Sequence, residues 1–307
     1  MGNEMVTRKQ TGIASYIGNP AVKANIEGIV GKENATRFVS SVVSAVQTNK
    51  ALAECTNTSI LSAALLGQAL NLTPSPQLGM FYMVPYDNKG TKEATFQLGY
   101  KGYIQLAIRS GQYKKIVASV VKQGEMKSYN PITEELVLSP LPESERNSLP
   151  TEGYYAKFEL VNGFTKELYW PKERMLHHAD RYSKAFSLNA TRGRNAKVSY
   201  ADYEAGKVPE SDMWKYSSFW YKDFDGMALK TILRQLISKW GIMSIDMEKA
   251  YTSDMGVIRE DGAVDYVDGV FDIDPRETAA QDIEENANAE EFVDAVPLDD
   301  NGEPLFK

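Results

Sequence analysis

The 307-residue sequence contains one cysteine and two histidines. A single cysteine, Cys55, excludes an internal disulfide framework and any zinc site built from several cysteines. No run of about eighteen apolar residues is present, so no membrane-spanning helix is expected. The polar residues 1–10 carry no apolar core of a secretion signal. We therefore expect a soluble, cytoplasmic protein without membrane contact, long enough to build a core that needs no metal.

Motifs for catalysis are also missing. Neither Gly31-Lys32 nor Gly206-Lys207 is followed by the serine or threonine that a phosphate-binding loop uses to hold magnesium. His177 and His178 are adjacent, and on a helix they point about 100° apart, so they do not form the usual pair of metal ligands. One of them alone is a candidate general base, with an ordinary surface position as the alternative. We expect no catalytic residue, no metal site and no cofactor.

The charge is unevenly distributed along the chain. The total is 34 basic against 41 acidic residues, a net of −7 that argues against nucleic-acid binding. From Asp254 onward, however, there are 17 acidic and three basic residues, which leaves 31 basic and 24 acidic residues in residues 1–253. The average therefore combines a basic body of +7 with an acidic tail of −14, and the objection to nucleic-acid binding applies only to the tail.

This division predicts three parts. Residues 1–12 form a flexible N-terminus, residues 13–253 form the core, and residues 254–307 form a disordered acidic tail because they have few large apolar residues. Isolated hydrophobic residues among the acids, at 291–293 and 304–306, suit a docking peptide for a partner. A merely solubilising tail is the alternative.

Basic residues gather within the body and alternate with aromatic residues. The gatherings lie at 96–127, 181–197 and 215–239. Basic side chains neutralise phosphates and aromatic rings stack on unpaired bases, so the mixture is typical of a surface for single-stranded nucleic acid. The alternative is that many of these tyrosines and tryptophans fill the core.

The hydrophobic patterns predict an α+β fold. Helices are expected after Asn34 and after Thr58, and again between Gly99 and Gly111. Short strands are expected at 80–85, 94–98 and 115–121, and a hairpin at 154–170 whose Asn162-Gly163 pair favours a type I′ turn. A helix opens at Pro171, and 183–211 reads as a long loop. A long helix ending at Gly241 should cross the small antiparallel sheet, with Lys230 and Arg234 projecting away from its apolar face.

Four segments resemble one family. They are residues 15–23, 64–86, 96–113 and 220–241; the most specific contains Gly99-Tyr100-Lys101-Gly102-Tyr103, and the last contains Lys230 and closes with Ser238-Lys-Trp-Gly241. In this order they resemble the RecT-type single-strand annealing proteins of phages and prophages. The resemblance covers roughly residues 13–250. The segment 181–211 looks like a basic insertion relative to shorter members, and it is left open whether it binds DNA or a neighbouring subunit.

The resemblance assigns DNA-binding roles to particular residues. It implies that Lys101, Lys230 and Arg234 contact the DNA backbone, and that Gly99 and Gly102 let the chain approach DNA closely, with an ordinary turn as the alternative. Tyr100, Tyr103 and Trp220 are candidates for stacking on bases, with a core position as the alternative for Tyr103. Further basic candidates are Arg109, Lys114, Lys115, Lys122, Lys222, Arg192 and Arg194.

The resemblance also implies an activity and partners. It implies ATP-independent binding of single-stranded DNA and annealing to its complementary strand in phage recombination, by a homo-oligomeric ring or helical filament. A phage exonuclease is the implied partner, and a host single-strand-binding protein could dock through the acidic tail. Two other classes stay open at this point: a phage nuclease with an unrecognised metal site, and a structural protein that polymerises without DNA.

Overall fold

The computed structural model describes residues 12–74, 77–88, 90–188, 196–259 and 261–266. Every element below belongs to one compact unit that ends at Gly269. The expected flexible N-terminus, apart from Gly12, and the tail beyond Tyr266 lie outside the described residues, as do Arg192 and Arg194. The described chain mixes helices with antiparallel sheets, so the predicted α+β class is confirmed.

The N-terminal region is helical, as the sequence predicts. It contains α1 (Ile13–Ile17), α2 (Pro20–Val30), α3 (Lys32–Thr48), the 3-10 helix η1 (Lys50–Glu54) and α4 (Asn57–Ala69). The Asn19 side chain caps α2, and the Thr56 hydroxyl accepts from the Ser59 amide at the start of α4. Helix α3 begins three residues and α4 two residues earlier than the pattern suggests. Across the described residues, no helix is both long enough and apolar enough to cross a membrane.

Two antiparallel sheets follow. The first has the order β1 (Phe81–Asn88), β2 (Thr91–Leu98), β8 (Gly256–Ile258) and β9 (Val264–Tyr266). The second has the order β3 (Tyr113–Lys122), β6 (Thr151–Leu160) and β7 (Thr165–Pro171). Between β3 and β6 lie a short hairpin, β4 (Met126–Tyr129) with β5 (Leu136–Leu138), and the single turn α6 (Glu143–Arg146).

The hairpin of β6 and β7 is confirmed, but its turn is not type I′. The Gly163 amide donates to the Leu160 carbonyl at 3.0 Å, and the Leu160 amide donates to the Phe164 carbonyl at 2.8 Å. Gly163 has a φ of 88°, whereas Asn162 is not among the described non-glycine residues with positive φ. This is a three-residue loop that ends in a glycine bulge, and a left-handed residue is needed at one position only.

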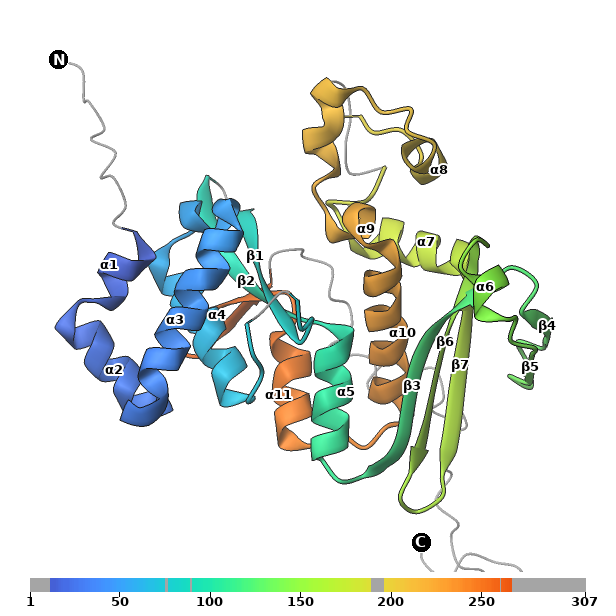
Figure 1. Cartoon of the computed structure of the whole chain (residues 1–307), viewed down its shortest axis with the longest axis horizontal. Helices are drawn as coiled ribbons and strands as arrows, with labels where there is room; N and C mark the ends of the chain where they lie inside the picture. Colours follow the sequence, from blue (N-terminus) through green and yellow to red (C-terminus); the bar gives the residue numbers. More distant parts are fainter. Residues whose placement is uncertain (1–11, 75–76, 89, 189–195, 260, 267–307) are drawn as a thin grey trace, which may run out of the picture. The chain divides into compact units, whose positions relative to one another are not determined.

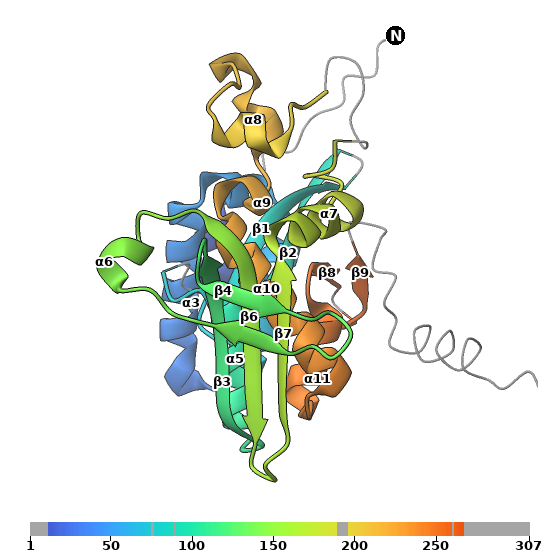
Figure 2. The same ribbon diagram turned by 90° about the vertical axis from the view of Figure 1, so that its right-hand side faces the viewer.

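Helix α10 (Phe224–Trp240) is the centre of this unit. It packs against β3, β6 and β7 on one side and against α5 (Tyr100–Arg109) on another. Figure 2 shows the second sheet lying across α10, and Figure 1 shows α5 beside it. The predicted long helix across a small sheet is therefore confirmed. Because α10 is covered on more than one side, it has less solvent-facing surface than a helix with one apolar stripe.

The segment expected as a long loop after α7 (Lys172–Tyr182) is partly ordered. It contains α8 (Tyr200–Glu204) and the start of the 3-10 helix η3 (Glu210–Tyr216), and α9 (Phe219–Lys222) follows it. The aromatic rings of this region pack on one another. The ring centre of Tyr221 lies 4.7 Å from that of Phe186 and 4.8 Å from that of Tyr203, and the ring centres of Phe224 and Tyr200 are 4.8 Å apart. For these residues the alternative reading, aromatic core, is what the structure shows.

The folded chain continues past the boundary expected at Asp254. Helix α11 (Ile245–Ser253) runs into Asp254, which is fully buried, and then into β8, whose residues are also buried. The Met255 amide donates to the Phe96 carbonyl at 2.7 Å, which joins this segment to β2. Residues 254–259 and 261–266 are therefore part of the fold. The sequence did not predict this, because the charge count alone does not distinguish a buried carboxylate from a solvated one.

Candidate nucleic-acid interface

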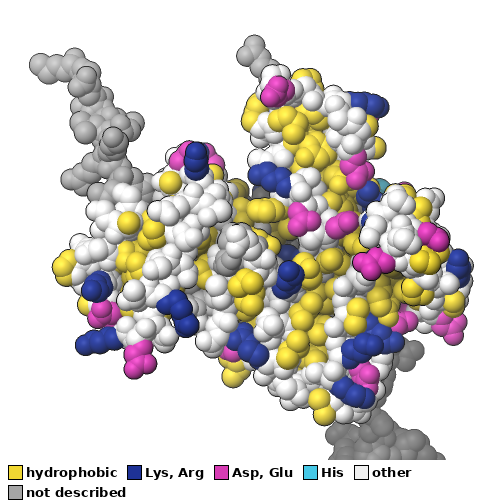
Figure 3. Space-filling model, in the orientation of Figure 1, with side chains coloured by type: hydrophobic (Ala, Val, Ile, Leu, Met, Phe, Trp, Pro, Cys, Tyr) yellow, Lys and Arg dark blue, Asp and Glu magenta, His cyan; other side chains and the backbone are white. Residues whose placement is uncertain are grey.

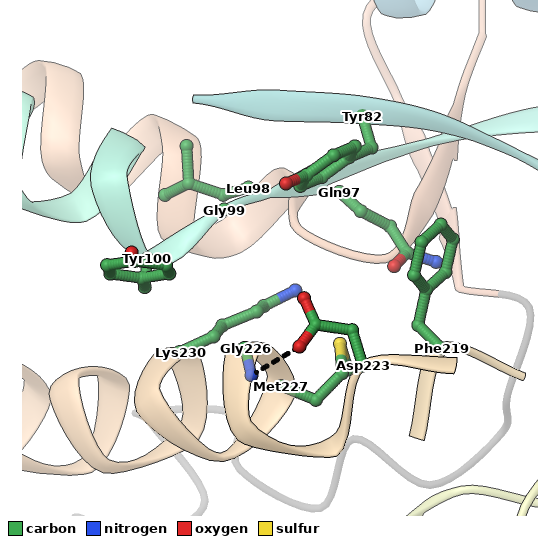
Figure 4. Close-up of a pocket in the computed structure, with 10 residues that line it drawn as sticks. All are labelled: Tyr82, Gln97, Leu98, Gly99, Tyr100, Phe219, Asp223, Gly226, Met227 and Lys230. Atoms are coloured by element: carbon green, nitrogen blue, oxygen red, sulfur yellow. Dashed lines mark hydrogen bonds between the residues drawn. The ribbon is translucent and has the colours of Figure 1, made fainter. Parts of the chain in front are cut away.

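A cleft lies where the first sheet meets the start of α10 (Figure 4). Tyr82 from β1, Tyr100 from α5 and Phe219 from α9 line it, and Asp223 and Lys230 belong to its α10 wall. The Tyr82 and Phe219 rings are 5.8 Å apart. The cleft holds about 50 Å³, enough for at most a few water molecules. A nucleotide does not fit inside, so a DNA strand would have to lie across its mouth.

Two exposed lysines flank these aromatic residues in the chain. Lys101 follows Tyr100, with its ammonium nitrogen 6.0 Å from the Tyr100 ring centre. Lys222 precedes Asp223, with its ammonium nitrogen 5.9 Å from the Phe219 ring centre. Neither lysine forms an ion pair with a carboxylate in the described part of the chain. Both charges are therefore available to a phosphate.

The glycines beside Lys101 have a packing role. A Cβ on Gly99 would lie 2.1 Å from the Gly79 carbonyl oxygen, and a Cβ on Gly102 would lie 2.1 Å from the Met80 carbonyl oxygen. Both glycines are buried. The close approach that they permit is to the protein's own chain at 79–80, so the expectation that they admit a DNA backbone is not needed to explain them.

The expectation that Lys230 and Arg234 project from the solvent-facing side of α10 is wrong. Both side chains turn inward to Asp254, whose side chain is 0% exposed. The Lys230 ammonium donates to one carboxylate oxygen at 2.8 Å, and the Arg234 guanidinium donates to the other at 2.9 Å. The Leu98 amide donates to the same carboxylate at 2.9 Å. The physical reason is that α10 buries this side as well, against α5 and the segment after α11.

This cluster holds two cations and one carboxylate away from solvent. Burial lowers the pKa of the Lys230 ammonium, and Asp254 opposes that shift. Tyr103 completes the group: its hydroxyl receives a hydrogen bond from Arg234 at 3.2 Å, and burial raises its pKa, so it stays neutral. The arrangement ties α5 and α10 to the segment that leads into β8. Lys230 lines the cleft, but its charge, like that of Arg234, is directed at Asp254 inside the protein.

Two predicted stacking residues are in the core. Tyr103 is 2% exposed and Trp220 is 5% exposed, so neither ring presents a face to a base. Tyr100, the third candidate, is half-buried and lines the cleft. For Tyr103 and Trp220 the core alternative describes the structure, because their rings fill space between packed elements.

The remaining basic candidates differ in what they contact. Arg109 donates to the carbonyls of Leu70 and Asn71, at 2.5 and 3.4 Å. Lys114 is paired with Glu159 at 2.5 Å, and Lys122 donates to the Thr151 hydroxyl at 3.1 Å.

Lys115, on β3, is exposed and has no carboxylate partner within 4 Å in the described chain, so its charge is as available as those of Lys101 and Lys222, although it does not line the cleft. Arg192 and Arg194 lie outside the described residues.

Two aromatic residues of the cleft, Tyr82 and Phe219, were not among the predicted site residues. In β1 the neighbours of Tyr82, Phe81 and Met83, are buried, so strict alternation along the strand turns Tyr82 outward. That signal was available from the sequence. Burial and the nearby Asp223 raise the pKa of Tyr82, which therefore keeps its hydroxyl proton. No comparable signal separates Phe219 from Trp220, since both fit a short helix equally well.

The histidines do not form a site. His178 packs between the rings of Trp170 and Tyr182, and burial, together with Arg174, lowers its pKa to about 4. His177 is exposed on the same helix. No group of three or more His, Cys, Asp or Glu side chains that could hold a metal ion occurs among the residues described. Cys55 is buried, and burial raises the pKa of its thiol to about 11.

Unpaired surface lysines beside half-buried tyrosines are typical of proteins that bind single strands of nucleic acid. The comparisons with known proteins sharpen this class. The family model described as the RecT family matches residues 36–266, most of the chain, so the chain belongs to the RecT family. Membership implies single-strand annealing in DNA recombination.

Two relatives agree with this assignment. The chain is 34% identical over 275 residues to the uncharacterized protein YqaK of Bacillus subtilis, covering 90% of this chain and 81% of the relative. It is 30% identical over 164 residues to protein RecT of Escherichia coli, covering 52% of this chain and 60% of the relative.

Proposed function

We propose that this chain binds single-stranded DNA by contacts to the DNA backbone. It anneals the bound strand to a complementary strand without ATP, as an oligomer on the DNA in the cytoplasm. The observation that carries the proposal is a pair of exposed lysines without a carboxylate partner in the described chain, Lys101 and Lys222, each next in the chain to a residue that lines the cleft, in a member of the RecT family. Backbone contacts fix a strand without reading its sequence, which leaves the bases free to pair.

Two side chains carry phosphate contacts at the cleft in this proposal: Lys101 and Lys222. Tyr82, Tyr100 and Phe219 offer ring faces at the cleft mouth for the bases nearest to those phosphates. Lys230 and Arg234 act indirectly, by holding α10 against α5 so that Lys101 and Lys222 stay in place. This division replaces the role in direct phosphate contact that the resemblance suggests for the two α10 cations.

Annealing of two labelled complementary oligonucleotides tests the proposal. Lys101→Glu should lower single-strand affinity by about tenfold at low salt and slow annealing in parallel, since a contact becomes a repulsion. Lys50→Glu is the matched control, because Lys50 is an exposed lysine on η1, away from the cleft. Both variants should unfold at the temperature of the wild type. If Lys101→Glu and Lys50→Glu bind alike, the cleft is not the interface.

The same assay separates the competing classes. Annealing should proceed at the same rate with and without ATP. A nuclease predicts shortened products when magnesium is added to labelled single-stranded DNA, and a structural polymer predicts assembly that ignores oligonucleotide. Either result, with no annealing, would replace the proposal by that class.

We further propose that the acidic residues beyond Tyr266 recruit a protein partner, for which a phage exonuclease and a host single-strand-binding protein are the candidates. The hydrophobic residues at 291–293 and 304–306 among acids support this. Truncation after Gly269 tests it, because truncation at Ser253 would also remove the buried Asp254 and β8. Unchanged retention of both partners by the truncated chain would leave the tail a solubilising segment.

A further inference from the structure

An exposed apolar tip lies just before α9 and α10. Trp214 is 64% exposed and its neighbour Met213 is 45% exposed, both on η3. The other aromatic residues of this region pack on one another, so Trp214 is an exception within an otherwise satisfied cluster. Tryptophans presented to solvent in this way are characteristic of the centres of protein interfaces.

The charge around the tip argues against DNA as its target. Residues 199–218 contain four acidic residues and two lysines. Both lysines are already paired within the segment, Lys207 with Asp202 at 2.7 Å and Lys215 with Asp212 at 3.0 Å. A segment with a net charge of −2 repels phosphates, whereas it favours a basic protein surface.

A second exposed apolar group lies beyond the other end of α10. We call it the end patch, and it consists of Ile108, Val161, Phe164, Ile242 and Ile245, which are 40–84% exposed. Hydrogen bonds join the three segments that carry it: the Val161 amide donates to the Gln112 carbonyl at 2.9 Å, and the Tyr113 hydroxyl donates to the Ile242 carbonyl at 2.9 Å. Five large hydrophobic side chains so gathered are more than the scattered single residues of an ordinary surface.

The end patch has the opposite charge balance to the tip. Its three segments, residues 107–115, 159–166 and 238–249, contain six basic and three acidic residues, a net of +3. Figure 3 shows hydrophobic side chains with lysine and arginine beside them over the lower part of α5 and β3, and hydrophobic side chains over the α8 segment. Ion pairs with neighbouring segments, Glu204 with Lys172 and Lys166 with Glu134, bring the two net charges to −1 and +2. The charges stay opposite in sign, so the acidic apolar tip matches the basic apolar end patch.

The two surfaces lie at opposite ends of α10. The 17 residues of this helix span about 26 Å, with η3 and α9 before its start and the Ile242–Ile245 turn after its end. Both views show α8 at one end of α10 and the turn of the β6–β7 hairpin at the other (Figures 1 and 2). A contact between different surfaces on opposite ends cannot close within a pair, so each added copy leaves a new surface free.

We propose that the tip of one copy of this chain docks on the end patch of the next, so that copies associate head to tail along the direction of α10. This inference rests on the oligomeric part of the proposed function and names the surfaces that build it. Repetition of one such contact produces an open filament or a ring, depending on the rotation between copies.

Engineered cysteines test the contact directly. In a chain that carries both Ser211→Cys and Thr165→Cys, at exposed positions beside Trp214 and Phe164, a short bismaleimide should link neighbouring copies into a ladder when oligo(dT) is present. The native Cys55 is 0% exposed and should react little. Ile29→Cys with Ile132→Cys is the matched control, since both side chains are exposed, at 55% and 90%, but lie outside the tip and the end patch. The control should give no ladder.

Sedimentation of Trp214→Ala and of the wild type tests the head-to-tail contact separately from the oligomeric part of the proposed function. Trp214→Ala should raise the protein concentration needed for half-assembly on oligo(dT) by about tenfold, while the affinity of one subunit for a short oligonucleotide stays unchanged. If the wild type assembles but Trp214→Ala half-assembles at the same protein concentration, the head-to-tail contact is wrong and the oligomer uses other surfaces. If the wild type anneals as a monomer, the oligomeric part of the proposed function itself fails. If Trp214→Ala loses short-oligonucleotide binding, the tip is a DNA contact and this inference is overturned.

Discussion

The chain contains two kinds of basic residue that look alike in the sequence. Lys101 and Lys222 lie at the surface beside a cleft, without a carboxylate partner in the described chain, whereas Lys230 and Arg234 are buried on one carboxylate. The first pair is available to an external anion, and the second pair already has its anion inside the protein. Removing a buried partner leaves an uncompensated charge, while changing a surface lysine costs little stability. The two pairs should therefore respond to mutation in opposite ways.

The largest effect is expected at Asp254. Asp254→Ala leaves Lys230 and Arg234 buried without a counter-charge, so the free energy of unfolding should fall by about 3–5 kcal/mol in urea titrations. Asp265→Ala is the control, because Asp265 is 58% exposed in its pair with Arg259, and such pairs contribute less than about 1 kcal/mol. Equal losses in the two variants would show that the buried cluster is not special.

A pH effect of similar size is expected at His178. Burial and the positive charges of Arg174, Arg234 and Arg181 oppose its protonation in the folded chain. The unfolded chain binds a proton near pH 6.5, whereas the folded chain keeps His178 neutral down to about pH 4. Stability is therefore present above pH 6.5 and decreases as the pH falls through this window, by about 3 kcal/mol in all. Unfolding measured from pH 7 to 4 should show this slope, and His178→Phe should flatten it. His177→Phe, at an exposed site, should leave the slope as it is.

A smaller effect is expected beside Lys101. Gly102→Ala places a methyl group against the Met80 carbonyl and should lower the free energy of unfolding by about 1–3 kcal/mol. Gly28→Ala, on α2 with no atom within 4 Å of the added Cβ, should raise it by about 0.5–1 kcal/mol. Thermal unfolding measures both. Opposite signs would confirm that Gly102 is required by packing, and a stabilised Gly102→Ala would remove that explanation.

Replacing one lysine of each kind by methionine should change stability least, and it tests directly which of the two lysines contacts DNA. Lys230→Met keeps the shape of a buried side chain and leaves Asp254 paired with Arg234, so single-strand affinity should stay at the wild-type value. Lys101→Met should stay folded but lower the affinity about threefold to tenfold, with the slope of log affinity against log salt reduced by about one. Fluorescence anisotropy across a salt series measures both. A reduced slope for Lys230→Met would place the buried lysine on the DNA.

The sequence predicted most elements but fewer of the site residues. The α+β class, the hairpin and the long helix follow from apolar spacing, because that spacing directly reflects which faces are buried. The buried position of Lys230 could not be predicted from this spacing. Its partner Asp254 is 24 residues away on another element, and a charged residue on a helix is usually solvated, so no local pattern reveals the pairing. The core positions of Trp220 and Tyr103 could not be predicted either, because aromatic residues suit both stacking on bases and packing in a core.

The position of Asp254 has a consequence for how the chain reaches its working form. The carboxylate that neutralises Lys230 and Arg234 comes after all but two short strands of the described fold, so the centre of the molecule is completed only when nearly the whole core has been synthesised. An incomplete chain carries two cations in its interior with nothing to balance them and has no stable way to close. A chain that ends before Asp254 is therefore expected to stay unfolded rather than to form a partly stable core.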